Sequence, residues 1–184
     1  MNSEDEALDV IFAGDEVRDD VPFHERRAHY WIRCRARVPE PAGSPLHAQA
    51  LAFFSDRVFF GVVQRVHHLH RYTDNAHTNG PGRLRTVFTA AEIDNISSAK
   101  NRGTTSPLTI DFMASMSHTM YYHELEALRA DEWVLVELNS PWADESRALT
   151  TQKMYSMQGK LVATCVQEGL IRLRERDRHP NSQL

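Results

Sequence analysis

The segment LHAQALAFFSDRVFFGVVQRV, residues 46–66, decides the fold, because it is the clearest helix in the sequence. One face at helical spacing is mostly apolar and comprises Leu51, Phe54, Ser55, Val58, Phe59 and Val62. A second apolar stripe comprises Ala48, Ala52 and Phe60. A helix that is apolar on more than one face is usually buried in the middle of a domain. The segment therefore predicts a long central helix.

Strand patterns lie on both sides of this helix. Over residues 26–38 two sets of side chains alternate with a period of two, as in a β-strand. Pro39 and Pro41 end the predicted strand. The strand candidates after the helix are 109–122, 132–138, 147–157 and 160–174. Gly159 lies between the last two and can supply the positive φ of a tight hairpin turn.

A single domain over residues 25–176 accounts for this order of elements. Residues 67–107 contain no convincing long element, although 83–88 and 90–96 are candidates for short pieces of structure. We expect a flexible acidic arm over residues 1–24 and a flexible tail over 177–184. A strand, a long helix and then a meander of strands predict an α+β hotdog fold, in which a mostly antiparallel sheet wraps around the helix.

Charge and composition exclude several classes of protein. The chain has 184 residues and a formal net charge of −4, which argues against nucleic acid as a partner. No run of about 20 apolar residues is present to span a bilayer. The only cysteines, Cys34 and Cys165, favour a reducing intracellular compartment. The sequence ends in Ser182-Gln183-Leu184, which is either a variant of the Ser-Lys-Leu peroxisomal address or an ordinary polar tail of a cytoplasmic protein.

Three polar residues are candidates for chemistry. Asp56 lies in the helix among aromatic residues, and partial removal from water would make it a better base; alternatively it pairs with a nearby arginine. Gln167 is a lone amide on an apolar strand face, where it either orients a water or a carbonyl or bonds to backbone. Ser115 is in neither a Gly-X-Ser-X-Gly motif nor a Ser-His-Asp order, so it either positions water or belongs to a solvated strand face.

The histidines next to the helix end could suggest a metal site. The three residues are His67, His68 and His70. Their spacing lacks a partner set of carboxylates or cysteines, so the sequence favours an exposed histidine-rich helix end. We expect no metal.

Three segments together resemble a known family. They are LAFFSDRVFF (51–60), ASMSHTMYYHE (114–124) with RADEWVLVE (129–137), and GKLVATCVQEGLIR (159–172). In order and spacing they are similar to the C-terminal hotdog domain of type II acyl-CoA thioesterases, a family with bacterial and peroxisomal members. The resemblance covers about residues 28–174.

The resemblance implies a site and a reaction. The family uses a helix Asp, a Thr or Ser on the next strand and a Gln on the last strand to activate water, and these fall on Asp56, Ser115 and Gln167. The implied reaction is hydrolysis of a fatty-acyl thioester to a free acid and coenzyme A, without an acyl-enzyme, metal or cofactor. The candidate substrate contacts are His118, Phe59 and Phe60.

Two departures from the family pattern leave alternatives open. Ser117 stands where the family usually has Asp, and the family chain normally holds two hotdog domains. We therefore expect a homodimer or larger homo-oligomer in which each copy supplies a second hotdog half. A non-catalytic acyl-binding or assembly subunit, or a hotdog isomerase or dehydratase of a polyketide-like pathway, are the alternative functions.

Overall fold

The structure is a computed structural model that describes residues 7–18, 20–39, 41–67, 69–71 and 108–175. Its elements, in chain order, are β1 (Leu8–Asp15), η2 (Phe23–Glu25), β2 (Ala28–Cys34), α1 (Pro45–Val66), β3 (His70–Arg71), β4 (Leu108–Tyr122), η3 (Leu125–Ala127), β5 (Val134–Asp144), β6 (Arg147–Tyr155) and β7 (Leu161–Glu175). The short pieces expected at 83–88 and 90–96, and the C-terminal Ser182-Gln183-Leu184, lie outside the described residues. The peroxisomal interpretation of that tripeptide therefore stays a prediction.

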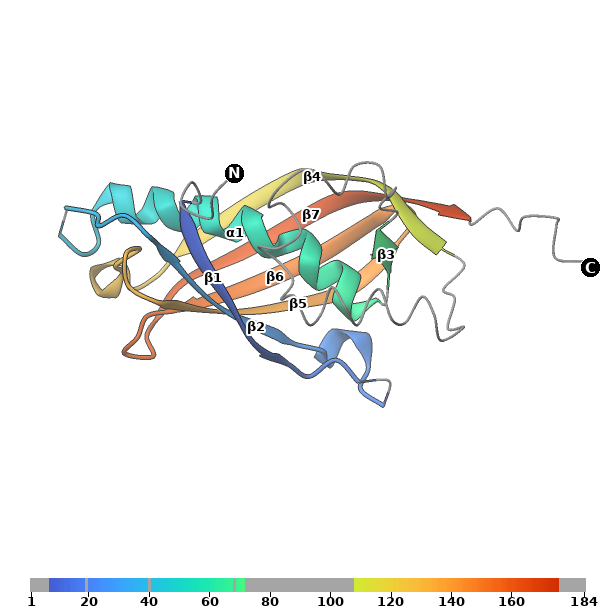
Figure 1. Ribbon diagram of the computed structural model, residues 1–184, viewed down its shortest axis with the longest axis horizontal. Helices are drawn as coiled ribbons and strands as arrows, with labels where there is room; N and C mark the ends of the chain where they lie inside the picture. The colour runs from blue at the N-terminus through green and yellow to red at the C-terminus, as the bar shows by residue number, and fades with distance from the viewer. Residues whose placement is uncertain (1–6, 19, 40, 68, 72–107, 176–184) are drawn as a thin grey trace, which may run out of the picture.

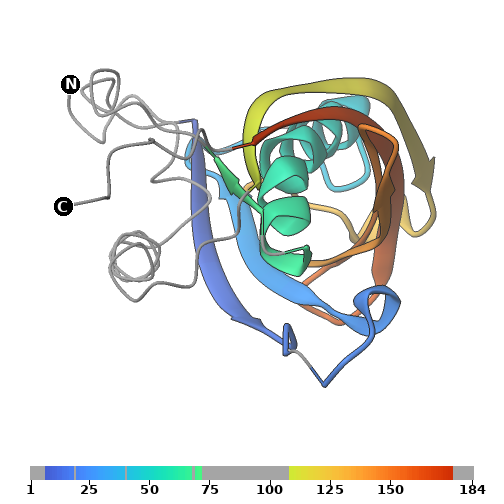
Figure 2. The ribbon, with the colours of Figure 1, turned by 90° about the vertical axis from the view of Figure 1, so that its right-hand side faces the viewer.

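The strands form one sheet that curls around α1 (Figures 1 and 2). The strand order is β1-β2-β5-β6-β7-β4-β3, and every neighbouring pair is antiparallel except the two-residue pairing of β3 with β4. The predicted hotdog architecture is confirmed. No helix in the described ranges is long and apolar enough to cross a membrane.

The buried side of α1 packs into the centre of the core. Phe54, Val58, Phe59 and Val62 are fully buried against the inner face of the sheet. Burying side chains of this size contributes about 1.5–3 kcal/mol each, so the helix is stabilised by packing rather than by intrinsic propensity.

Both ends of α1 are defined by specific residues. Ser44 has an extended backbone at the N-cap position and Pro45 occupies the first helical position, where its missing N–H costs nothing. At the other end, the buried Arg26 donates from Nη1 to the carbonyl of Val66 (2.7 Å) and from Nε to that of Val21 (2.8 Å). The guanidinium thus satisfies a terminal helix carbonyl.

The predicted N-terminal arm is wrong for residues 8–15, which form β1 and pair with β2. Side chains hold this strand in place. Asp9 bonds to Arg35 (2.6 Å) and to Arg33 (2.9 Å), and the Phe12 ring lies 5.3 Å from that of Tyr30. The hydrogen bond from Arg35 keeps the pKa of Asp9 below its ordinary value.

A tight turn that contains Gly159 joins β6 to β7, as the sequence predicted. That residue has φ +75°, and its N–H donates to the carbonyl of Ser156 (2.9 Å). The turn sets the register of the β6–β7 hairpin, and this register aligns Thr150 with Gln167.

Candidate functional site

Asp56, Ser115 and Gln167 converge at one point, although they come from α1, β4 and β7. The Ser115 hydroxyl donates to Asp56 Oδ1 at 3.0 Å, and the Gln167 amide Nε2 donates to the same oxygen at 2.6 Å. Gln167 Nε2 also lies 3.1 Å from Ser115 Oγ. The three side chains therefore form a closed triangle around one carboxylate oxygen.

The direction of Ser115 depends on an irregularity in β4. Simple alternation along 109–122 puts Ser115 on the solvated face of the strand. The β4–β7 register instead shifts between Ser115 and Ser117, which oppose the adjacent residues Gly169 and Glu168. A bulge of this kind gives one strand an extra residue and redirects its side chains. Ser115 consequently faces α1, although its side chain stays exposed to solvent.

A second bulge in β4 lies between Ile110 and Phe112. Together, the two bulges set which residues of β4 meet the helix. Besides Ser115, the contacts to α1 are made by Met113 with Gln64, His118 with Ser55 and Tyr122 with the Ala48 carbonyl. One long edge strand thus contacts most of the length of the helix.

The three site residues differ in their exposure. Gln167 is fully buried, and its Oε1 has no hydrogen-bond partner among the described residues. Asp56 and Ser115 are exposed. The expected withdrawal of Asp56 from water is therefore wrong for the single chain, because Phe53, one of the aromatic neighbours expected to shield it, points outward and is 57% exposed.

A second set of polar contacts surrounds Ser55, the residue before Asp56. The Ser55 side chain is fully buried; its Oγ lies 2.6 Å from His118 Nε2 and 2.7 Å from the carbonyl of Ala52. Its backbone carbonyl accepts a bond from the buried amide of Gln152 (2.7 Å). Neither Ser55 nor Gln152 was predicted to be functional from the sequence. The available signal was a polar residue on the apolar face of the helix and another at an inward-facing position of β6.

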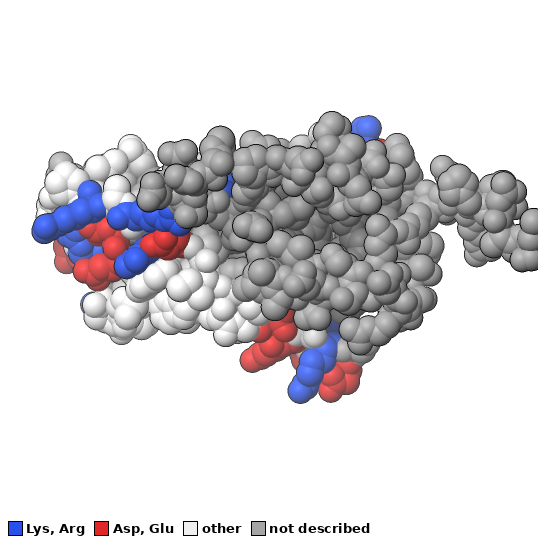
Figure 3. All heavy atoms as spheres, in the orientation of Figure 1, with Lys and Arg blue, Asp and Glu red and all other residues white. Residues whose placement is uncertain are grey.

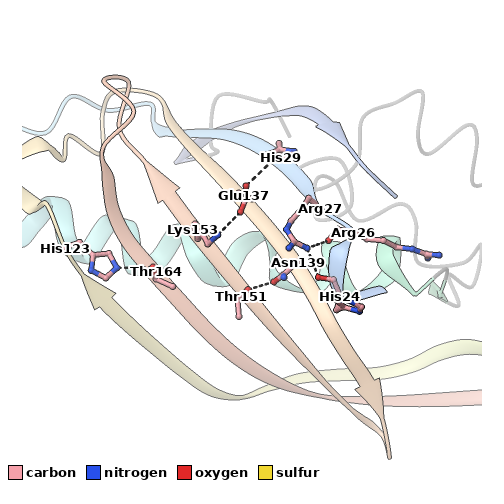
Figure 4. A network of polar contacts seen from close by, with 10 residues as sticks. All are labelled: His24, Arg26, Arg27, His29, His123, Glu137, Asn139, Thr151, Lys153 and Thr164. Atoms are coloured by element: carbon pink, nitrogen blue, oxygen red, sulfur yellow. Dashed lines mark hydrogen bonds and ion pairs between the residues drawn. The ribbon is translucent and has the colours of Figure 1, made fainter. Parts of the chain in front are cut away.

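The outer face of the sheet has a different character. Polar side chains from neighbouring strands pair across it, including His29 with Glu137, Lys153 with Glu137, and His123 with Thr164 (Figure 4). On the molecular face in Figure 3, described basic and acidic side chains lie close together rather than in a patch of one sign. The candidate site lies on the helix side of the sheet, where Asp56 of α1 contacts Ser115 and Gln167.

The comparisons with known proteins identify the family of the chain. The family model for the acyl-CoA thioesterase C-terminal domain matches residues 10–171. The chain belongs to this family. The curated relatives include acyl-coenzyme A thioesterase 8 of mouse, 29% identical over 82% of this chain and 34% of that protein, and of human, 27% identical over 82% and 34%.

Two solved structures are also similar to this member of the family. The acyl-CoA thioesterase II TesB2 of Mycobacterium marinum has a TM-score of 0.59 and 28% identity, and the match covers 93% of this chain and 51% of that one. A tesB protein of Mycobacterium avium subspecies paratuberculosis has a TM-score of 0.52 and 20% identity, covering 90% and 48%. The chain thus spans about a third of the curated relatives and half of these solved chains.

The thiol nearest the three site residues is poorly suited to act as a nucleophile. Cys165 is buried on β7, two residues before Gln167. Burial raises the pKa of its thiol to about 11, so the group is protonated at neutral pH. Within the described residues, no three His, Cys, Asp or Glu side chains are grouped to hold a metal ion.

The three residues predicted to contact substrate lie in different environments. Phe59 is fully buried in the core, and its assignment as a substrate contact stays a prediction. The Phe60 side chain lies outside the described part of the chain. His118 is exposed, but its ring contacts Ser55. Of the histidines near the helix end, His67 bonds to Ser140 (3.0 Å).

Proposed function

We propose that this chain carries the catalytic site of an acyl-CoA thioesterase and hydrolyses fatty-acyl thioesters with Asp56 as the base. Family membership supports the reaction class. The observation that carries the residue assignment is the convergence of the Ser115 hydroxyl and the Gln167 amide on one oxygen of Asp56.

The geometry suggests how the three residues divide the work. Two donors fix the orientation of the Asp56 carboxylate through Oδ1, so Oδ2 is the oxygen that can take a proton from water. The water oxygen then bonds to the thioester carbonyl carbon. When the resulting tetrahedral species collapses, the C–S bond breaks and the proton held by Asp56 passes to the coenzyme A sulfur. The products are a free acid and coenzyme A.

Direct attack by water is favoured over an acyl-enzyme. The Ser115 hydroxyl donates to a carboxylate and accepts from an amide, and its described contacts include no histidine. A serine nucleophile is normally activated by a histidine that acts as a base. The Cys165 thiol is protonated at neutral pH. Water is therefore the nucleophile that best fits the site.

We also propose that a second copy of the chain covers the site in a homodimer. Within the described residues, β4 pairs with β7 along one edge, whereas β3 covers only Thr109 and Ile110 on the other. Large apolar side chains on β4 and α1 are exposed: Leu46, Phe53, Phe112, Met116, Tyr121 and Tyr122. An open strand edge with exposed apolar side chains tends to pair with another chain. A partner there would remove water from Asp56.

The test is release of free thiol from a panel of acyl-CoA esters of increasing chain length. The wild-type chain should release coenzyme A, and Asp56→Ala should abolish release while keeping the thermal unfolding transition. Glu168→Gln is the matched control, because Glu168 neighbours Gln167 on β7 but pairs with Arg147 (3.0 Å). Turnover that survives in Asp56→Ala would show that the assigned site is wrong.

The same experiment separates the second candidate function. The exposure of Asp56 in the single chain is the observation that favours an acyl-binding module without turnover. Saturable binding of acyl-CoA with no thiol release, in a preparation that light scattering shows to be dimeric, would select that function.

A further inference from the structure

Beside the Asp56 triangle lies a contact that the proposed chemistry does not use. His118 Nε2 is 2.6 Å from Ser55 Oγ, and Ser55 immediately precedes Asp56 on α1. The contact therefore joins β4 to the same helical turn that carries the candidate base. Its position makes it able to control where the Asp56 carboxylate lies.

The protons of this contact can be assigned. Ser55 Oγ also lies 2.7 Å from the carbonyl of Ala52, which can only accept a hydrogen bond. We assign the single hydroxyl proton of Ser55 to the Ala52 carbonyl. With this assignment, His118 carries a proton on Nε2 and donates it to Ser55 Oγ. His118 thus acts as a donor from the strand to the helix.

The bulge in β4 explains why one strand reaches two consecutive helix residues. Residues three apart in a regular strand point to opposite faces. Because of the extra residue between Ser115 and Ser117, both Ser115 and His118 face α1. Ser115 bonds to Asp56 and His118 bonds to Ser55. His118 is also the cross-strand partner of Gln167.

The turn of α1 around Asp56 is consequently fixed from three strands. β4 contributes Ser115 and His118, β7 contributes Gln167, and β6 contributes Gln152, which donates to the Ser55 carbonyl at 2.7 Å. The contact of Ser55 with His118 is the shortest of those that Ser55 makes.

We propose that His118 is a positioning residue, whose Nε2–H bond to Ser55 keeps the Asp56 carboxylate in register with Ser115 and Gln167. This inference rests on the proposed thioesterase function. It replaces the expectation that His118 contacts substrate. Because the ring acts through Ser55, its loss lowers kcat and leaves KM nearly unchanged, whereas loss of a substrate contact would raise KM.

The test uses a double-mutant cycle in the thiol-release assay. His118→Ala and Ser55→Ala should each lower kcat about 10- to 100-fold, since a misplacement of about 1 Å can cost 100-fold. The double variant should be no slower than the slower single variant, because both changes remove one contact. His118→Gln, whose amide can replace the Nε2 donor, should recover most of the rate.

A matched histidine provides the control. His123 follows β4 and bonds to Thr164 on the outer face of the sheet (3.0 Å), so His123→Ala should keep the wild-type kcat. A raised KM with unchanged kcat in His118→Ala, or a double variant whose loss is the product of the two single losses, would overturn the proposal.

A readout without turnover separates this inference from the proposed function. In ¹⁵N-histidine spectra at a pH where the ring is neutral, His118 should carry its proton on Nε2, and Ser55→Ala should change that signal. If this signature is present while the wild-type chain releases no thiol, the contact exists and the thioesterase assignment fails. A neutral ring protonated on Nδ1 would contradict the donor role of His118.

Discussion

At the scale of single residues, the site depends on how many hydrogen bonds the Asp56 carboxylate receives. Two neutral donors from different strands meet one oxygen, and a hydrogen bond to a charged group contributes about 1.5–3 kcal/mol. Ser115 and Gln167 were predicted as partners of Asp56 by the family resemblance rather than by their local pattern. The pattern alone left a structural role open for each of the three.

The hydroxyl of Ser115 is tested by two substitutions. Ser115→Ala removes one donor to Asp56, so kcat should fall about 10- to 100-fold, which corresponds to the loss of one charged hydrogen bond. Ser115→Thr keeps the hydroxyl and should stay within a few-fold of the wild type. Equal rates in the two variants would mean that the hydroxyl has no part in the reaction.

The Cys165 thiol makes the stability of the fold depend on alkaline pH. Its pKa is raised from 9.0 to about 11 by burial, so the folded state holds a proton that the unfolded state has released. This stabilisation is complete below pH 9 and is lost as the pH rises through 11. Because a pKa unit corresponds to about 1.4 kcal/mol, the loss is at most about 3 kcal/mol.

The measurement is the free energy of unfolding by urea between pH 8 and pH 11, compared for the wild type and Cys165→Ala. The wild type should lose stability more steeply over this interval, whatever the absolute stability of the variant. Parallel curves would show that the thiol titrates normally in the folded state.

At the scale of elements, the long helix and the strands after it were predictable because their apolar periods are clear. The helix expected at 46–66 is α1, and the strand expected at 147–157 is β6 (Arg147–Tyr155). The face of β4 that meets the helix was not predictable. Strict alternation cannot reveal where an extra residue enters a strand, since a bulge depends on the pairing with β7.

Strand β1 was missed for a related reason. Its acidic residues suggested a solvated arm, but Asp9 pairs with arginines of the strand and loop beside it, and Phe12 packs on Tyr30. These partners lie more than fifteen residues away in the sequence. Local composition therefore could not show that the segment completes the sheet.

The loop before α1 depends on one glycine. Gly43 has φ +78°, and an added Cβ would lie 3.0 Å from the carbonyl oxygen of Leu125 and 3.1 Å from the Cα of Glu126. Gly43→Ala should therefore destabilise the fold by about 1–3 kcal/mol, and more than Gly159→Ala. Gly159 has a similar φ of +75° but open space around it.

Thermal or urea unfolding of the two variants separates the cost of the backbone conformation from the cost of the close contact. The loss of unfolding free energy in Gly159→Ala measures the cost of the backbone conformation alone. The additional loss in Gly43→Ala measures the cost of the close approach of the 125–126 backbone. Equal losses would mean that the backbone shifts at no cost to admit a methyl group.

At the scale of the whole molecule, Asp56 is exposed, and within the described residues β3 pairs with only two residues of the β4 edge. The exposed Asp56 and the exposed apolar side chains of α1 and β4 are consistent with an interface rather than a surface that faces solvent. The proposed dimer predicts that Met116→Lys, which places a charge on this edge, halves the mass measured by light scattering and lowers activity.

The opposite edge of the sheet provides the control. Ile11 on β1 is 51% exposed, similar to Met116 at 57%. Ile11→Lys should leave both mass and activity unchanged. A wild-type chain that is a stable, fully active monomer would refute the dimer, and dissociation by Ile11→Lys alone would move the interface to β1.

We propose that Asp56, oriented by Ser115 and Gln167, activates the water that hydrolyses an acyl-CoA thioester. The most direct test is the kcat of Asp56→Asn for its best acyl-CoA, measured by thiol release beside the wild type and Glu168→Gln. Asparagine keeps the size of the side chain but cannot accept the proton, so kcat should fall at least about 100-fold while Glu168→Gln stays near the wild type. An Asp56→Asn variant with wild-type kcat would contradict the account.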